Sequence, residues 1–191
     1  YRRQRQMCIR EDDTVDFYRL ENDQLKHIAQ YKCETGFGTR HIVFSKDGNY
    51  FYVVGELSSQ INVVKFNEDT WDFENIATYK TIPADFTDHN GAAALYISQD
   101  GKYVYTSNRG HNSIAVFKVN DDHTLSLVQR VSTFGDFPRD FNWDKDQRYV
   151  VVANQNTDNA TLYTRNAGTG SLTPIQKEIS VPEGTRVLFT K

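Results

Sequence analysis

The chain has 191 residues, and 22 Lys and Arg against 25 Asp and Glu give it a formal net charge of −3 at pH 7. This length is enough for one domain with a sizeable core, and the charge indicates no bulk attraction for nucleic acid or for an anionic membrane. Neither kind of partner is expected, and an anion-binding site would have to be built from a few placed arginines.

The two cysteines, Cys8 and Cys33, are too few for a disulfide framework and do not have the spacing of metal ligands. They favour a reducing compartment, so a cytoplasmic location is expected. His27, His89 and His123 do not lie at the spacing of metal ligands either. We expect no metal and no other cofactor.

Aromatic residues form 13% of the chain and there are only four prolines, a balance that favours strands over helices. The basic start, YRRQRQ, has no periodic pattern and is interpreted as a solvated end. Three short strands are expected before residue 32. From residue 40 the pattern predicts four strands. The segment RHIVFSKDGNYFYVVGEL contains the first two, and INVVKFNE and FENIATYKTI are the third and the fourth.

The same order of strands then returns twice, as AAALYISQDGKYVYTSNRG with SIAVFKVN and LSLVQRVST, and as PRDFNWDKDQRYVVVANQN with ATLYTRNA and LTPIQKEIS. Gly48 aligns with Gly101 at a spacing of 53, and Gly101 aligns with Gln147 at a spacing of 46. A four-strand unit with this period is typical of a β-propeller blade and is favoured here over a β-sandwich. We therefore predict an all-β propeller of four-stranded antiparallel blades.

The predicted domain spans residues 1–191 and contains a partial blade (1–39), three blades (40–91, 92–137 and 138–182) and a closing strand (183–191). Because the strands of a blade are antiparallel, the start of its first strand and the end of its second meet at one rim, close to the central channel. Binding and catalytic side chains are expected at that rim.

The aligned turns superpose Arg40, Ala93 and Arg139 at the start of the first strand, and Glu56, Arg109 and Gln155, with Arg10 as a fourth, at the end of the second. An isolated pair of Arg40 and Glu56 would be explained as a structural ion pair, which contributes about 0 to 1 kcal/mol at a surface. Further arginines in register, with His41 and His111 beside them, favour a site for an anionic small molecule.

Five phrases carry a resemblance to a known family: GTRHIVFSKDGNYFYVVGE, LYISQDGKYVYTSNRGHNSIAVF, PRDFNWDKDQRYVVVANQN, GTGSL and VPEGTRVLF. Together they resemble the lactonase family of seven-bladed propellers, which includes propeller-type 6-phosphogluconolactonases and carboxymuconate cyclases. The resemblance begins near Arg40 and implies about four blades of a probable seven, from the C-terminal part of a longer chain. The repeat alone also permits a four-bladed ring, in which the last residues pair with residues 6–31.

Carried over position by position, the resemblance implies catalytic roles for Arg40, Glu56 and His41. The predicted substrate-binding residues, from the resemblance and from the register of the repeat, are Arg109, His111, Arg139, Asn108 and Gln155. The sequence departs from the family pattern at Thr39, where proline is usual, and at Ala94, where many members have a carboxylate.

The implied activity is hydrolysis of 6-phosphogluconolactone, a step of carbohydrate metabolism. Glu56 or a histidine would activate water, and the arginines would bind phosphate or stabilise the developing oxyanion. Two alternatives remain open at this point: a muconate-type lactonising enzyme, and a non-catalytic propeller that binds an anionic small molecule or a protein partner. A serine hydrolase is not predicted, because the chain has no G-x-S-x-G motif.

Overall fold

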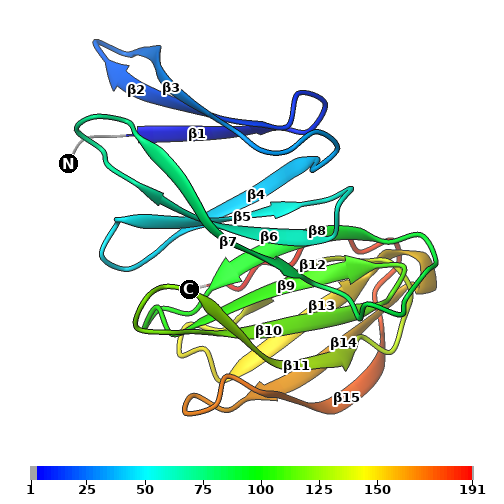
Figure 1. Cartoon of the computed structure of the whole chain (residues 1–191). Helices are drawn as coiled ribbons and strands as arrows, with labels where there is room; N and C mark the ends of the chain where they lie inside the picture. Colours follow the sequence, from blue (N-terminus) through cyan, green and yellow to red (C-terminus); the bar gives the residue numbers. More distant parts are fainter. Residues whose placement is uncertain (1–3, 191) are drawn as a thin grey trace.

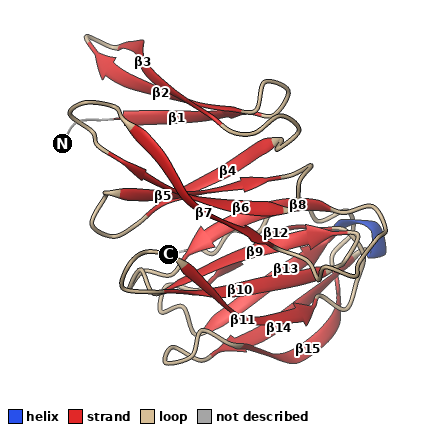
Figure 2. Cartoon of the chain, viewed as in Figure 1, coloured by secondary structure: helices blue, strands red, loops and turns tan. Residues whose placement is uncertain are grey.

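The structure, a computed structural model, describes residues 4–190. Strands and turns make up nearly all of this range, with one short 3-10 helix (Figure 2). None of the helical structure in residues 4–190 is long and apolar enough to cross a membrane. Arg2 and Arg3 of the expected solvated end, and Lys191 of the expected closing strand, lie outside the described residues.

The strands form four antiparallel sheets that follow one another in chain order (Figure 1). The first sheet contains β1 (Gln4–Ile9), β2 (Thr14–Glu21) and β3 (Gln24–Lys32). The second contains β4 (Thr39–Phe44), β5 (Tyr50–Gly55), β6 (Gln60–Phe66) and β7 (Phe73–Lys80). The third contains β8 (Gly91–Ile97), β9 (Tyr103–Arg109), β10 (Ser113–Val119) and β11 (Leu125–Ser132). The fourth contains β12 (Pro138–Trp143), β13 (Tyr149–Asn154), the 3-10 helix η1 (Gln155–Thr157), β14 (Asn159–Arg165) and β15 (Leu172–Ser180). The predicted all-β propeller architecture is confirmed: three sheets are complete blades and the first has three strands.

The same turn joins the first two strands of each complete blade. Gly48, Gly101 and Gln147 have φ angles of 78°, 77° and 55°, and each donates its backbone N–H to the carbonyl three residues before it. A side chain makes this left-handed conformation costly, so glycine fits it without strain and Gln147 does not. The turns therefore superpose as the sequence alignment predicts.

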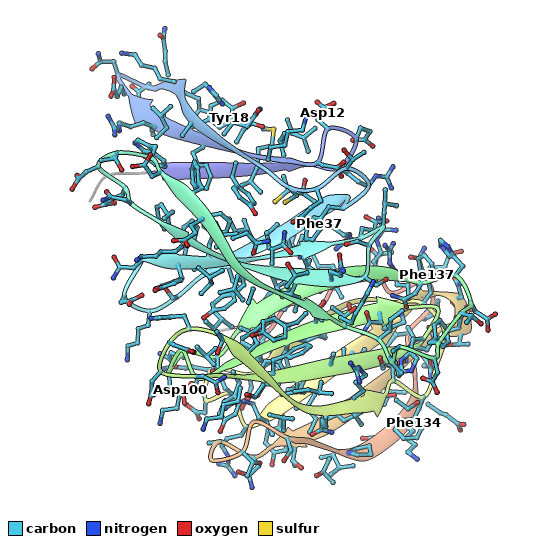
Figure 3. All side chains as sticks on the ribbon, in the orientation of Figure 1. Asp12, Tyr18, Phe37, Asp100, Phe134 and Phe137 are labelled. Atoms are coloured by element: carbon cyan, nitrogen blue, oxygen red, sulfur yellow. The ribbon has the colours of Figure 1, made fainter. Side chains whose placement is uncertain are left out.

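Apolar side chains fill the space between successive sheets (Figure 3). Phe17 of the first sheet and Phe51 of the second are fully buried in one cluster, and Phe37 is buried with them. Tyr52 and Phe117 belong to the next cluster, between the second and third sheets. Each blade thus depends on its neighbour to cover one apolar face, which explains why a four-strand unit must repeat in this architecture.

The closing strand expected at residues 183–191 is not formed within the described residues, because residues 181–190 contain no strand. Val187 instead lies along β12: its N–H donates to Asp140 Oδ2 at 2.9 Å, and its carbonyl accepts from Asn142 Nδ2 at 3.2 Å. Among the described residues β1 pairs only with β2, so the four-bladed ring is also not formed. β12 is the edge strand of its sheet, but Val187 hydrogen-bonds to side chains of β12 and not to its backbone, so no strand pairing forms there.

Candidate active site

The start of the first strand and the end of the second strand meet at one rim, as the repeat predicts. In β4 a β-bulge leaves Arg40 without a partner on β5, and in β12 a bulge leaves Arg139 without a partner on β13. A bulge bends its strand and redirects the side chain of the extra residue. The two blades therefore present an arginine from the same position of the repeat.

Glu56 lies directly after β5 and contacts three arginines. Arg109 Nη2 is 2.7 Å from Glu56 Oε1, Arg40 Nε is 3.3 Å from Oε2, and Arg10 Nη1 is 3.5 Å from Oε1. The Glu56 side chain is only 15% exposed. Arg10 follows β1, Arg40 belongs to β4 and Arg109 ends β9, so the cluster joins three successive sheets.

This cluster keeps Glu56 ionised. Burial alone would raise the pKa of Glu56, but the hydrogen bond and charge of Arg109, with the charges of Arg40 and Arg10, outweigh burial and lower it. Both carboxylate oxygens are occupied by guanidinium groups. A carboxylate held in this way is a weak proton acceptor and lies where it can anchor the arginines, and the catalytic role expected for Glu56 stays a prediction.

Several groups of the protein contact the Arg109 side chain and hold it in place. Its Nε donates to the Gly91 carbonyl at 3.1 Å, and its guanidinium lies 4.9 Å from the ring centroid of Phe137 (labelled in Figure 3). The side chain is 8% exposed. The following Gly110 has φ 119°, and a Cβ there would collide with the His89 carbonyl, so glycine is required to turn the chain after Arg109.

His41 lies on the other side of Arg40. Its Nε2 is 3.3 Å from Arg40 Nη1, and its Nδ1 is 3.4 Å from the backbone nitrogen of Leu95. Burial, followed by the charge of Arg40, lowers the pKa of His41 to about 4. The imidazole is therefore neutral at pH 7, and one of its two nitrogens carries no proton; this nitrogen faces an N–H donor, either Arg40 or the backbone of Leu95.

An open cleft of about 320 Å³ lies at this rim. Its lining residues come from three blades and from the C-terminal segment: Arg40, His41, Tyr96, Arg139, Asp140, Thr185 and Arg186. Asp140 is 7% exposed, and its Oδ1 accepts from the Tyr96 hydroxyl at 3.0 Å. A second open cleft of about 380 Å³ shares Arg40, His41 and Tyr96 and extends to Cys8.

The structure brings Arg139 and Gln155 together and places His111 elsewhere. Arg139 Nη1 is 3.5 Å from Gln155 Oε1, across the hairpin that corresponds to Arg40 and Glu56. His111 Nδ1 is 2.7 Å from Ser113 Oγ, and its ring packs edge-on against Phe86. Among the lining residues of the two clefts at the rim His111 does not occur, so its substrate-binding role stays a prediction without a geometric counterpart.

Asn108 is fully buried, and its amide hydrogen-bonds within the protein. Its Oδ1 accepts from Thr81 Oγ1 at 2.7 Å, and its Nδ2 donates to the Thr81 carbonyl and to Ser113 Oγ, each at 3.3 Å. Asn154 in the next blade repeats one of these contacts by donating to the Thr133 carbonyl at 3.0 Å. The amide therefore ties one blade to the preceding one, and the substrate-binding role of Asn108 stays a prediction.

We expect Asn108→Ala to lower the free energy of unfolding by about 1 to 3 kcal/mol, because the hydroxyl and carbonyl of Thr81 lose buried partners. Urea denaturation measures this change. Gln176→Ala, at an exposed position of β15 whose side chain has no hydrogen bond to the described residues, is the control and should change stability by less than about 0.5 kcal/mol. Unchanged stability with weakened ligand binding would instead support the substrate-binding role.

Sequence reasoning did not identify Arg186 as a site residue. The signal is present, because Gly184-Thr185-Arg186 repeats the Gly38-Thr39-Arg40 phrase that precedes the first complete blade. This repetition places Arg186 at the same position of the repeat as Arg40. Only the path of the C-terminal segment, which lies beside β12, shows that both arginines line one cleft.

Comparison with known proteins supports this reading of the fold. A 6-phosphogluconolactonase from Bacillus subtilis is 39% identical over 178 residues, which are 93% of this chain and 51% of that protein. A solved structure of a protein from Lactobacillus plantarum superposes with a TM-score of 0.91 at 50% identity, covering 94% of this chain and 53% of that one. A periplasmic gluconolactonase from Pseudomonas aeruginosa superposes with a TM-score of 0.82 at 32% identity, covering 90% of this chain and 49% of that one.

The chain thus spans about half the length of the curated relatives that it matches. The family described as "Lactonase, 7-bladed beta-propeller" matches residues 8–189, from the end of β1 to the segment that carries Arg186. Nearly all of the described blades fall inside that match. The chain belongs to the lactonase family of seven-bladed β-propellers.

Proposed function

We propose that this protein hydrolyses 6-phosphogluconolactone to 6-phosphogluconate. The observation that carries the proposal is the rim cleft, where the half-buried, neutral His41 lies beside Arg40 and faces the same space as Arg139. A proton acceptor and several positive groups are what hydrolysis of an anionic ester requires. The name of the Bacillus subtilis relative supports the choice of lactone.

In the proposed reaction His41 accepts a proton from water as the water oxygen attacks the lactone carbonyl. Arg40, whose Nη1 lies 3.3 Å from His41 Nε2, stabilises the negative charge that forms on the carbonyl oxygen. The bond between the carbonyl carbon and the ring oxygen then breaks, and His41 returns the proton to that oxygen. The products are a carboxylic acid and a hydroxyl group, so no co-reactant besides water is consumed.

Glu56 and Arg109 support this reaction indirectly. The 2.7 Å contact between Arg109 and Glu56, and the 3.3 Å contact between Arg40 and Glu56, hold the guanidinium of Arg40 in place. Positioning a charged group before the reaction avoids the cost of reorganising it during the reaction. We also propose a cytoplasmic location, which the two free thiols Cys8 and Cys33 favour.

We expect kcat/KM to stay nearly constant between about pH 5.5 and pH 7.5 and to fall as the pH approaches 4. The pKa of His41 is lowered to about 4, so the imidazole stays neutral between about pH 5.5 and pH 7.5. As the pH approaches 4 the imidazole becomes protonated, and it can then no longer accept a proton from water. The measurement is a pH–rate profile corrected for spontaneous hydrolysis. An acidic limb centred near pH 6.5 would belong to an unshifted histidine and would contradict the assignment of His41.

The proposed function is tested by assaying the purified protein on 6-phosphogluconolactone and on a muconate lactone, together with a binding titration of 6-phosphogluconate. Turnover of the phosphorylated lactone above the spontaneous rate is the expected result. Turnover of the muconate substrate alone would favour a lactonising enzyme. Binding without turnover of either compound would favour a non-catalytic module.

A further inference from the structure

Two arginines of the rim cleft have no carboxylate partner among the described residues. Arg139 has only the 3.5 Å contact with Gln155, and Arg186 lines the same cleft from the C-terminal segment. Both side chains are exposed to solvent. Arg40 and Arg109, by contrast, have a carboxylate partner, because Glu56 contacts both and neutralises part of their charge.

The fold holds Arg186 at this position. The next residue, Val187, donates its N–H to Asp140 Oδ2 at 2.9 Å and accepts a hydrogen bond from Asn142 Nδ2 at 3.2 Å. Asp140 directly follows Arg139 in β12. The two hydrogen bonds therefore fix the backbone beside Arg186 to the strand that carries Arg139.

The cleft carries excess positive charge. It is lined by Arg40, Arg139 and Arg186, while its single carboxylate, Asp140, is occupied by the Tyr96 hydroxyl and the Val187 N–H. The pKa of Arg40 is lowered by burial first and also by the charges of Arg109 and Arg139, which shows that these charges act on one another. A bound dianion would compensate this repulsion, because guanidinium groups form charge-assisted hydrogen bonds with phosphate oxygens.

We propose that Arg186 and Arg139 together bind the phosphate of the substrate and thereby select phosphorylated over unphosphorylated lactones. This inference rests on the proposed function and names the residues of that site that determine specificity. Arg40 and His41 line the same cleft, so a single molecule places its phosphate at the arginine pair and its carbonyl at the reacting groups. Arg186 contacts the phosphate in the ground state as well as the transition state, so it acts on substrate binding.

The experiment compares equilibrium binding of 6-phosphogluconate and gluconate, the two stable products, to the wild-type protein and to Arg186→Gln. We expect Arg186→Gln to weaken binding of 6-phosphogluconate by about 10- to 100-fold, as for the loss of a hydrogen bond to a charged group, with gluconate binding unchanged. Arg148→Gln is the matched control, because Arg148 is an exposed arginine at the opposite end of the hairpin between β12 and β13. It should leave both affinities unchanged.

Arg139→Gln and the double variant complete a mutant cycle. If both arginines hold one phosphate, the double variant loses less affinity than the sum of the two single losses, because the second removal acts on a site that is already weakened. Arg186→Lys keeps the charge without the planar donor pair, and we expect an intermediate loss. Thermal unfolding of every variant shows that the fold is kept.

The inference and the proposed function fail separately. If the wild type hydrolyses 6-phosphogluconolactone and Arg186→Gln binds 6-phosphogluconate as tightly as Arg148→Gln does, the function stands and the role of Arg186 is wrong. If the wild type binds 6-phosphogluconate no more tightly than gluconate, the phosphate site is wrong whatever the rate of hydrolysis. If the arginine variants behave as expected but no lactone is hydrolysed, the phosphate site stands and the catalytic proposal fails.

Discussion

His41→Gln is expected to lower kcat/KM for 6-phosphogluconolactone by about 10²- to 10⁴-fold, the usual contribution of a placed general base. Glutamine keeps a hydrogen-bonding group beside Arg40 but has no nitrogen that accepts a proton near neutral pH. The loss should lie mainly in kcat, because proton transfer belongs to the transition state and contributes little to substrate binding. Initial rates, corrected for spontaneous hydrolysis, measure both parameters.

His27→Gln is the matched control for this experiment. His27 belongs to β3, contacts Asp16 and does not line the rim clefts, so its replacement should change kcat/KM by less than about threefold, which corresponds to under about 0.7 kcal/mol. Equal losses for the two histidine variants would show that His41 has no special role. If His41→Gln left kcat/KM unchanged, the result would favour Glu56 as the general base.

Glu56→Gln is expected to destabilise the protein by about 3 kcal/mol, at the lower end of the cost of breaking a buried ion pair. Glutamine has nearly the same shape, but it removes the negative charge that faces Arg109, Arg40 and Arg10. The mostly buried guanidinium of Arg109 would then lack its charge partner. We also expect a lower rate of hydrolysis, because Arg40 would no longer be held beside His41.

Urea denaturation at pH 7 measures the change for Glu56→Gln, with Glu11→Gln as the control. Glu11 also contacts Arg10, but its side chain is 72% exposed, so its pair should contribute no more than about 1 kcal/mol. The anchor role predicts that high salt affects the Glu11 pair more than the Glu56 cluster. Unchanged stability of Glu56→Gln with complete loss of hydrolysis would contradict the anchor role and identify Glu56 as the base.

The repeat could be predicted from the sequence because it depends on local properties. Alternation of apolar residues determines which face of a strand is buried, and a turn residue with positive φ marks where a hairpin reverses. Aligning Gly48 with Gly101 and Gln147 was therefore enough to superpose the strands, and it placed Arg40 and Arg109 at the rim with Glu56. In the structure both arginines contact Glu56.

The part played by each site residue depends on contacts between blades, which no alignment of one chain with itself contains. Asn108 and Arg109 are neighbours in β9, yet Asn108 is buried against Thr81 of the preceding blade while Arg109 reaches Glu56. Arg186 has the same sequence signal as Arg40, but its place in the cleft depends on hydrogen bonds of Val187 to side chains of β12. Register along a strand follows from residue type and spacing, whereas burial and charge pairing depend on which surfaces meet, and only the tertiary structure decides that.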